Sequence, residues 1–161
     1  MANAATTAPT AQSNHYPGPG CNPFAREQWN LNGSNNVEAV YLGSTFTYSV
    51  TFRQFGSCLT GTLTDPYFPT TGPIFGTVFG DHVMFSFRYP SGSIQGTRTY
   101  IGTIHRLGRF GRSGRSGAVS GTWSETGSEN GSGTFTLAKN ARSACPSFFW
   151  WNPNRACLVF P

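Results

Sequence analysis

A tripeptide in which Gly and Thr precede a large apolar residue recurs five times along this chain and constrains its fold more than any other feature. The copies begin at Gly61, Gly76, Gly102, Gly121 and Gly133. Each copy lies in a short run that alternates apolar and polar residues and is bounded by turn residues. Alternation with a period of two is typical of half-buried β-strands. The repeat therefore predicts one β-strand after another, joined by short turns.

The composition agrees with this prediction. Charged residues make up 11% of the 161 residues and aromatic residues 15%, and there are 20 glycines. Low charge combined with many Thr, Ser, Gly and aromatic residues suits strands with polar turns better than a helical bundle. The length favours a single domain that can bury a core without relying on disulfides.

The strand pattern predicts an all-β fold. We expect strands over 27–31, 38–42, 45–54, 58–64, 74–79, 82–89, 98–105, 118–125 and 133–138. Pro66, Pro69 and Pro73 predict a loop over 65–73, since proline cannot donate to a strand ladder. Short connections favour an antiparallel up-and-down meander of about eight strands, and closure into a barrel removes its exposed edges. Barrel strands coil strongly, and the glycine of each repeat would permit the bend.

The chain divides into three segments. Residues 1–23 are expected to form a flexible tail rich in Ala, Thr, Pro and Gly, residues 24–139 the barrel, and residues 140–161 an aromatic-rich C-terminal segment. Alternatively, 16–21 runs extended across the barrel. The aromatic run 148–151 either plugs one barrel end or is an exposed anchor for a ligand, a partner or a lipid surface.

The four cysteines are compatible with two disulfides. Spacing favours Cys145 with Cys157, closing a short loop, which leaves Cys21 to pair with Cys58. The alternative is four reduced cysteines. Disulfides indicate an oxidising compartment, and residues 2–4 resemble the end of a signal-peptide cleavage site, so we expect a secreted or extracytoplasmic protein. No cysteine or histidine spacing is typical of zinc, and we expect no metal.

The net charge of +5 is concentrated in one loop. Its arginines, separated by glycines, are Arg106, Arg109, Arg112 and Arg115. Such a segment can bind phosphates or carboxylates, so an anionic partner is one interpretation, and a solvated hairpin loop is the other. A nucleic-acid-binding protein would need a basic face rather than one basic loop. No stretch is long enough to span a membrane.

The alternation also supplies aromatic residues that are expected to point into the barrel, namely Phe46, Tyr48, Phe52, Phe85, Phe87, Tyr89, Tyr100, Trp123 and Phe135. Small barrels hold either packed side chains or one small ligand. A few polar groups among aromatic residues could orient an apolar ligand. The candidate ligand-binding residues are Ser44, Tyr48, Phe85, Phe87, Arg88, Tyr100 and Trp123. The alternative is that the aromatic residues simply fill the core.

Two short motifs resemble the avidin and streptavidin family, whose members are small eight-stranded barrels of the calycin group. They are Leu-Gly-Ser-Thr-Phe over 42–46 and Leu-Thr-Gly-Thr over 59–62. In that family a serine of the first motif helps to bind biotin, and Ser44 is at that position. The family has a tyrosine where this chain has Leu63, and the tryptophans here do not match its ligand box. The resemblance therefore implies the barrel shape only.

Catalytic patterns are absent from the sequence. Nothing places any two of its carboxylates together, Asp81 is explained by its turn, and His82 and His105 lie at strand ends. No nucleophile elbow is present. We expect no cofactor, and we assign no catalytic residue.

The leading hypothesis is a small secreted barrel that binds an apolar or aromatic small molecule in its interior, and we expect such a protein not to be an enzyme. The first alternative is a structural or surface-interaction protein that self-assembles into a homo-oligomer. The second is a cofactor-free cyclase or isomerase, since shape and exclusion of water could supply catalysis without a motif.

Overall fold

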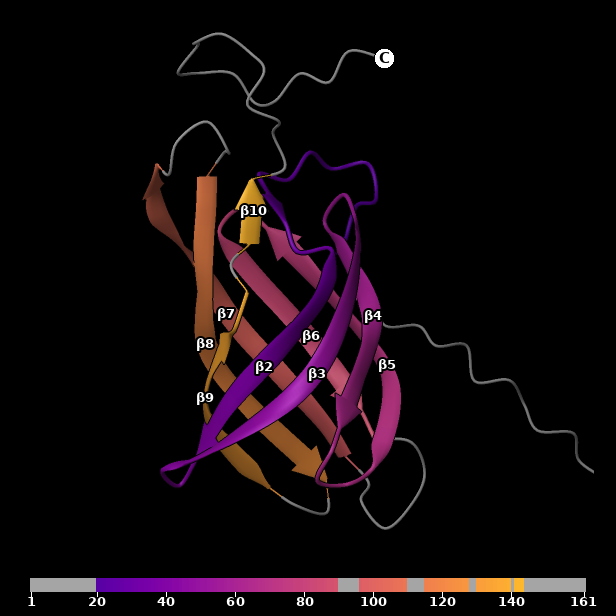
Figure 1. Ribbon diagram of the computed structural model, residues 1–161. Coiled ribbons are helices and arrows are strands. Elements are labelled where there is room, and N and C mark those ends of the chain that lie inside the picture. The colour runs from indigo at the N-terminus through magenta and orange to yellow at the C-terminus, as the bar shows by residue number, and fades with distance from the viewer. Residues whose placement is uncertain (1–19, 90–95, 110–114, 128–129, 140, 144–161) are drawn as a thin grey trace, which may run out of the picture.

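The fold is all-β. The computed structural model describes residues 20–89, 96–109, 115–127, 130–139 and 141–143 (Figure 1). The strands are β1 (Trp29–Asn30), β2 (Gly33–Tyr41), β3 (Ser44–Phe55), β4 (Cys58–Asp65), β5 (Thr70–Phe79), β6 (His82–Arg88), β7 (Gly96–Arg109), β8 (Arg115–Gly127), β9 (Gly131–Leu137) and β10 (Ala141–Ser143). No helix occurs in these ranges. The expected all-β class is confirmed.

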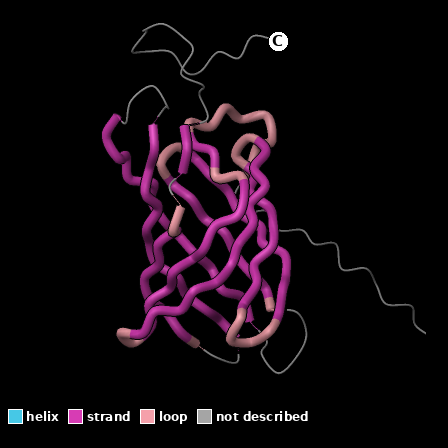
Figure 2. The backbone as a smooth tube through the Cα atoms, viewed as in Figure 1, coloured by secondary structure: helices cyan, strands magenta, loops and turns pink. Residues whose placement is uncertain are grey.

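Eight of the strands close into a barrel. Each strand from β2 to β9 pairs antiparallel with the next, and β9 also pairs with β2. The expected up-and-down meander is therefore confirmed. Strand β8 pairs with β9 over Ser120–Glu125, whereas its beginning pairs with β10, and β10 in turn pairs with β1. Figure 2 shows that the connections gather at the two ends of the barrel.

One expected loop is in part a strand. The segment 65–73 was expected to be a loop, but β5 already begins at Thr70 and includes Pro73. Pairing of β5 with β6 begins only at Ile74, so at Pro73 the strand pairs with β4 alone. A residue without an N–H is tolerated where one side of a strand has no partner.

The glycines of the repeat lie where neighbouring strands approach closely. A Cβ at Gly61 would collide with the carbonyl oxygen of Thr51, and a Cβ at Gly121 would collide with that of Ile101. The other three copies also lie too close to an adjacent strand for a Cβ. The repeat thus allows strongly coiled neighbouring strands to approach closely, because no side chain lies between them.

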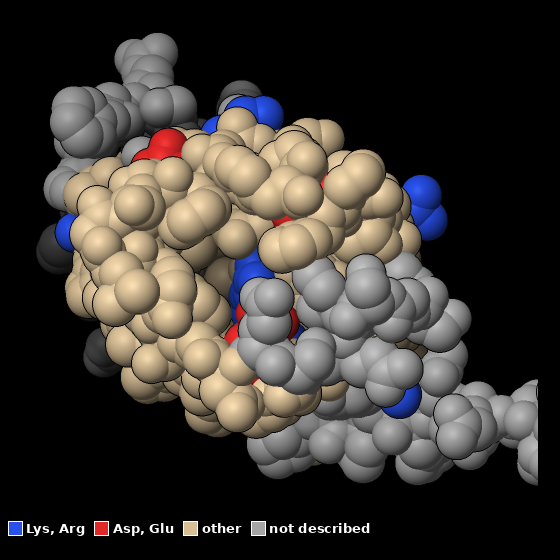
Figure 3. All heavy atoms as spheres, turned by 90° about the horizontal axis from the view of Figure 1, so that it is seen from below, with Lys and Arg blue, Asp and Glu red and all other residues tan. Residues whose placement is uncertain are grey.

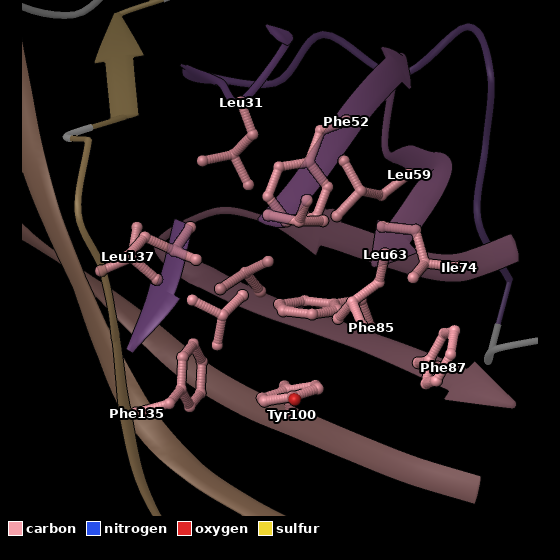
Figure 4. Packing of buried hydrophobic residues seen from close by; sticks show 14 of the residues in the cluster. Leu31, Phe52, Leu59, Leu63, Ile74, Phe85, Phe87, Tyr100, Phe135 and Leu137 are labelled. Atoms are coloured by element: carbon pink, nitrogen blue, oxygen red, sulfur yellow. The ribbon is translucent and has the colours of Figure 1, made fainter. Parts of the chain in front are cut away.

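Aromatic and aliphatic side chains fill the middle of the barrel (Figure 4). The ring of Phe85 stacks on that of Tyr100, with the ring centroids 4.6 Å apart, and Phe52 and Phe135 meet Phe85 edge-on. Full burial of a side chain of this size contributes about 1.5–3 kcal/mol. In the middle of the barrel, therefore, the aromatic side chains pack against one another as a core.

The N-terminal segment is attached at the end of the barrel where β3 meets β4 and β5 meets β6, hereafter the disulfide end. Cys21 forms a disulfide with Cys58, as expected. The backbone N–H of Asn22 donates to the Ser57 hydroxyl at 2.6 Å, and the Ser57 N–H donates to the Asn22 carbonyl at 2.9 Å. Cys145 and Cys157 lie outside the described residues, as do the segments 1–19 and 144–161.

Candidate functional site

A group of charged side chains lies inside the opposite end of the barrel, near the β2–β3 turn and the β4–β5 loop. It consists of Asp65 at the end of β4, Arg98 near the start of β7 and Glu125 near the end of β8. Their side chains are 0%, 8% and 6% exposed. We call these three residues the Arg98 cluster and this end of the molecule the Arg98 end. Charged residues are almost never so fully buried unless they are paired.

Arg98 is paired with both carboxylates. Its Nε and Nη2 donate to Oε2 of Glu125 at 2.9 and 2.7 Å, and its Nη1 lies 4.0 Å from Oδ2 of Asp65. Asp65 Oδ2 also accepts from the Tyr89 hydroxyl at 2.9 Å. Its Oδ1 accepts from the backbone N–H groups of Tyr67 and Phe68. Counted at formal charges, the cluster carries one excess negative charge.

Three aromatic rings surround the Arg98 guanidinium. Its central carbon lies 4.9 Å from the ring centroid of Tyr48, 5.2 Å from that of Trp123 and 5.4 Å from that of Tyr89. These distances are within the range of cation–π attraction. Trp123 is oriented by its Nε1, which donates to the Val40 carbonyl at 3.2 Å. The rings and carboxylates together hold the guanidinium in one position.

The hydroxyl of Tyr100 is buried, and no described residue accepts a hydrogen bond from it; the nearby Arg98 guanidinium has only donors. Burial raises the pKa of Tyr100 above its ordinary value, while the nearby positive charge of Arg98 acts in the opposite direction. Burial likewise raises the pKa of Tyr48 and of Tyr89. All three tyrosines are therefore neutral hydrogen-bond donors at physiological pH.

Arg98 itself stays charged. Burial by itself lowers the pKa of a guanidinium, but the neighbouring tyrosine oxygens and the hydrogen bonds to Glu125 raise the pKa of Arg98 above its ordinary value. The site thus combines a fixed cation, two carboxylates and several phenol groups in a space shielded from water.

Seen end-on, this end of the barrel is hollowed, and atoms of basic and acidic residues are visible within the hollow (Figure 3). Large apolar side chains near the connections at this end are partly exposed, namely Tyr41, Leu42, Tyr67 and Phe68. We call these four residues the aromatic rim. The ring of Tyr67 packs edge-on against Phe46 and Tyr48, which joins the rim to the rings around Arg98. The hollow therefore has apolar walls and a charged floor.

The structure brings together some of the candidate ligand-binding residues. Tyr48, Tyr100 and Trp123 lie at the Arg98 cluster. Ser44 is exposed beside the β2–β3 turn at the same end, and its role stays a prediction.

Of the remaining candidates, Phe87 lies beside the cluster, since it pairs with Arg98 across β6 and β7 and its ring packs edge-on against Tyr89 with centroids 4.8 Å apart. Phe85 and Phe87 are fully buried in the aromatic core. Arg88 does not fit the expectation that it orients a molecule in the interior. Its side chain is exposed, because alternation along β6 directs it opposite to Phe87.

Sequence reasoning missed the residues with the most distinctive environment. Asp65 and Glu125 were not expected to lie together, yet both flank Arg98, which was not a candidate at all. The sequence did contain a signal for them. Arg98 is two residues before Tyr100, and Glu125 is two residues after Trp123, so alternation places both charged residues on the inward face. A charged residue at an inward position near a strand end identifies this kind of site.

The arginine-rich loop is described only in part. Arg106 is exposed on β7, its Nη2 lies 3.6 Å from Oδ2 of Asp81, and the same nitrogen donates to Gln28 at 3.2 Å. Arg112 and the side chains of Arg109 and Arg115 lie outside the described residues. Anion binding by this loop stays a prediction.

A second depression, of about 400 Å³, lies on the outer surface over β2, β3, β8 and β9. Exposed threonines such as Thr122, Thr134 and Thr136 line much of it. It has no buried charged group, and rows of paired hydroxyl side chains are ordinary on the solvent face of a sheet. We therefore place the candidate site at the Arg98 end.

Comparisons of the chain with protein-family models, with curated proteins and with solved structures find no match. The resemblance to avidin is thus supported at the level of an eight-stranded antiparallel barrel. No helix in the part of the chain that the structure describes is long and apolar enough to cross a membrane. The same residues contain no group of three or more His, Cys, Asp or Glu side chains placed to hold a metal ion.

Proposed function

We propose that this protein binds one apolar or aromatic small molecule at the Arg98 end of its barrel. The ligand would lie in the hollow, with the aromatic rim beside it and the Arg98 cluster beneath it. Ligand sites are typically concave and largely apolar, with a few convergent polar groups that fix orientation. Small barrels that bind a ligand hold it within the strands.

The observation that carries this proposal is the buried Arg98 guanidinium, enclosed by three aromatic rings beside a Tyr100 hydroxyl that has no acceptor. Replacing a buried ion pair by apolar side chains is often neutral or stabilising. Stability alone therefore gives little reason to keep charges at this end. Polar groups held in fixed positions are instead what recognition of a ligand requires.

The Cys21–Cys58 disulfide supports a location outside the cytosol. We propose a secreted or extracytoplasmic protein that binds its ligand without a cofactor. Such a carrier would need only the barrel and the site at its end.

Titration with N-phenyl-1-naphthylamine, an uncharged aromatic dye that fluoresces in apolar sites, tests the proposal. We expect saturable binding of one dye per barrel. Tyr67→Ala should weaken it severalfold, because Tyr67 belongs to the aromatic rim. Phe79→Ala is the matched control, since Phe79 is exposed at the disulfide end. Absence of saturable binding, or equal effects of the two variants, would contradict the proposal.

Native mass spectrometry of the purified protein separates this function from the alternatives. A retained small molecule on a discrete monomer or small oligomer supports ligand binding and identifies the ligand. A ladder of large assemblies without added mass supports the self-assembling structural protein instead. A retained molecule that is chemically converted over time would support the cyclase or isomerase.

A further inference from the structure

We propose that the ligand of this site is uncharged and has an oxygen acceptor, such as a carbonyl group, to which the Tyr100 hydroxyl donates. This inference rests on the proposed function and specifies the chemical class of the ligand. It follows from the position of Tyr100, from the hydrogen bonds already made by its neighbours and from the charge of the Arg98 cluster.

The hydroxyl of Tyr100 is held in place. Its ring stacks on Phe85 with centroids 4.6 Å apart and meets Phe135 edge-on at 5.2 Å. Tyr100 lies two positions after Arg98 along β7, so both side chains face the interior. Tyr100 also pairs across β7 and β8 with Trp123, whose ring lies against the Arg98 guanidinium, so Tyr100 is next to the Arg98 cluster. Figure 4 shows the ring in this core layer.

The neighbours of this hydroxyl leave it without an acceptor. A guanidinium has N–H donors and no acceptor. Oε2 of Glu125 accepts twice from Arg98, both oxygens of Asp65 accept from Tyr89 or from backbone N–H groups, and no described oxygen forms a hydrogen bond with the Tyr100 hydroxyl. A buried donor without a partner is unfavourable, so a ligand oxygen that accepts from Tyr100 gains more here than in water. A further N–H of Arg98 could donate to the same oxygen.

The charge of the cluster favours a neutral ligand. Asp65 and Glu125 outweigh Arg98 by one formal negative charge, and Arg98 already donates to Glu125. A carboxylate ligand would add a like charge in a buried site where the described residues offer no second cation to pair with it. A cationic ligand would have to lie beside the guanidinium, which already occupies the space between the aromatic rings.

Three naphthalenes of nearly equal shape test the inference by displacement of N-phenyl-1-naphthylamine. They are 2-acetylnaphthalene, 2-isopropenylnaphthalene, in which a CH₂ group replaces the carbonyl oxygen, and 2-naphthoate, which is anionic. We expect the ketone to bind tighter than the carboxylate. Tyr100→Phe should weaken ketone binding about five- to tenfold, as expected for loss of one hydrogen bond, and leave the hydrocarbon within about twofold. Phe79→Ala, at an exposed position of the disulfide end, should change neither.

The outcomes distinguish the two proposals. If dye and hydrocarbon bind but Tyr100→Phe leaves ketone affinity unchanged, or if 2-naphthoate binds most tightly, this inference is overturned and the proposed function stands. If neither the dye nor any naphthalene binds to the wild-type protein, the proposed function fails as well. Retained dye binding by Tyr100→Phe shows that the variant is folded.

Discussion

The indole Nε1 of Trp29 donates a hydrogen bond to Oδ1 of Asp81 at 2.7 Å, across 52 residues of sequence. Gln28 donates to the same oxygen at 2.7 Å, and Arg106 lies 3.6 Å from the other carboxylate oxygen. Asp81 belongs to the β5–β6 turn, and from the sequence alone we explained it only as a turn residue. In the structure it attaches Gln28 and the start of β1 to the disulfide end of the barrel.

Removal of this carboxylate should destabilise the protein. Asp81→Ala leaves the buried Trp29 N–H without an acceptor, which costs about 1–3 kcal/mol. Asp81→Asn keeps an acceptor oxygen and should cost less. Urea unfolding followed by circular dichroism measures both free energies. Equal values for the two variants would show that the charge matters and the indole hydrogen bond does not.

Arg98 should be among the most sensitive positions in the chain. Arg98→Met removes the cation from between two buried carboxylates, and breaking such a pair typically costs about 3–5 kcal/mol. Arg88→Met, on the outer face of β6, should change the free energy of unfolding by less than about 0.5 kcal/mol. Chemical denaturation compares the two. If Arg98→Met lowered the free energy of unfolding as little as Arg88→Met, the buried carboxylates would not depend on the Arg98 charge.

The glycine repeat should not tolerate a methyl group. In Gly121→Ala the new Cβ would meet the carbonyl of Ile101, so the strands must move apart, and we expect a loss of about 1–3 kcal/mol or more. Thr122→Ala, at the adjacent exposed position, should have a much smaller effect. Thermal unfolding of the two variants tests this. Similar melting temperatures would mean that the close approach is not needed.

Reduction of the Cys21–Cys58 disulfide should lower stability by about 2–4 kcal/mol, because the bond restricts the unfolded chain over 37 residues. Unfolding by denaturant with and without dithiothreitol measures the loss. A variant with Cys21→Ala and Cys58→Ala should already show the lower stability in the oxidised sample. If that variant is as stable as the oxidised wild type, the attachment of the N-terminal segment contributes nothing.

The buried tyrosines predict instability at high pH. The folded-state pKa values of Tyr48, Tyr89 and Tyr100 lie above the ordinary value of 10.0. The folded protein therefore holds these protons more tightly than the unfolded chain, and their stabilisation is complete below about pH 10 and is lost as the pH rises further. We expect the tyrosinate absorbance of these residues to rise only together with unfolding. Tyr100→Phe should make the alkaline loss of stability shallower, and an unchanged slope would contradict this.

The sequence predicted the barrel because its evidence is local. Alternation assigns Phe85 and Phe87 to one face of a strand, and the turn at Gly80 and Asp81 joins neighbouring strands. Pro73 was assigned to a loop, but in the structure it belongs to a strand that pairs with β4 alone at this residue. The sequence does not show whether a strand has one neighbour or two at a given position. The pairing of Cys21 with Cys58 was predicted from spacing and is confirmed.

What the sequence determined by itself is therefore the succession of strands, the faces of their side chains and the order of the meander, since these depend on residues adjacent along the chain. Only the tertiary structure decided that Asp65, Arg98 and Glu125 meet. They come from β4, β7 and β8, and their meeting depends on barrel closure and on the register of each strand pair. Local alternation can mark Arg98 and Glu125 as inward, but it cannot show which strands bring them together, and a shift by one residue would turn Arg98 outward.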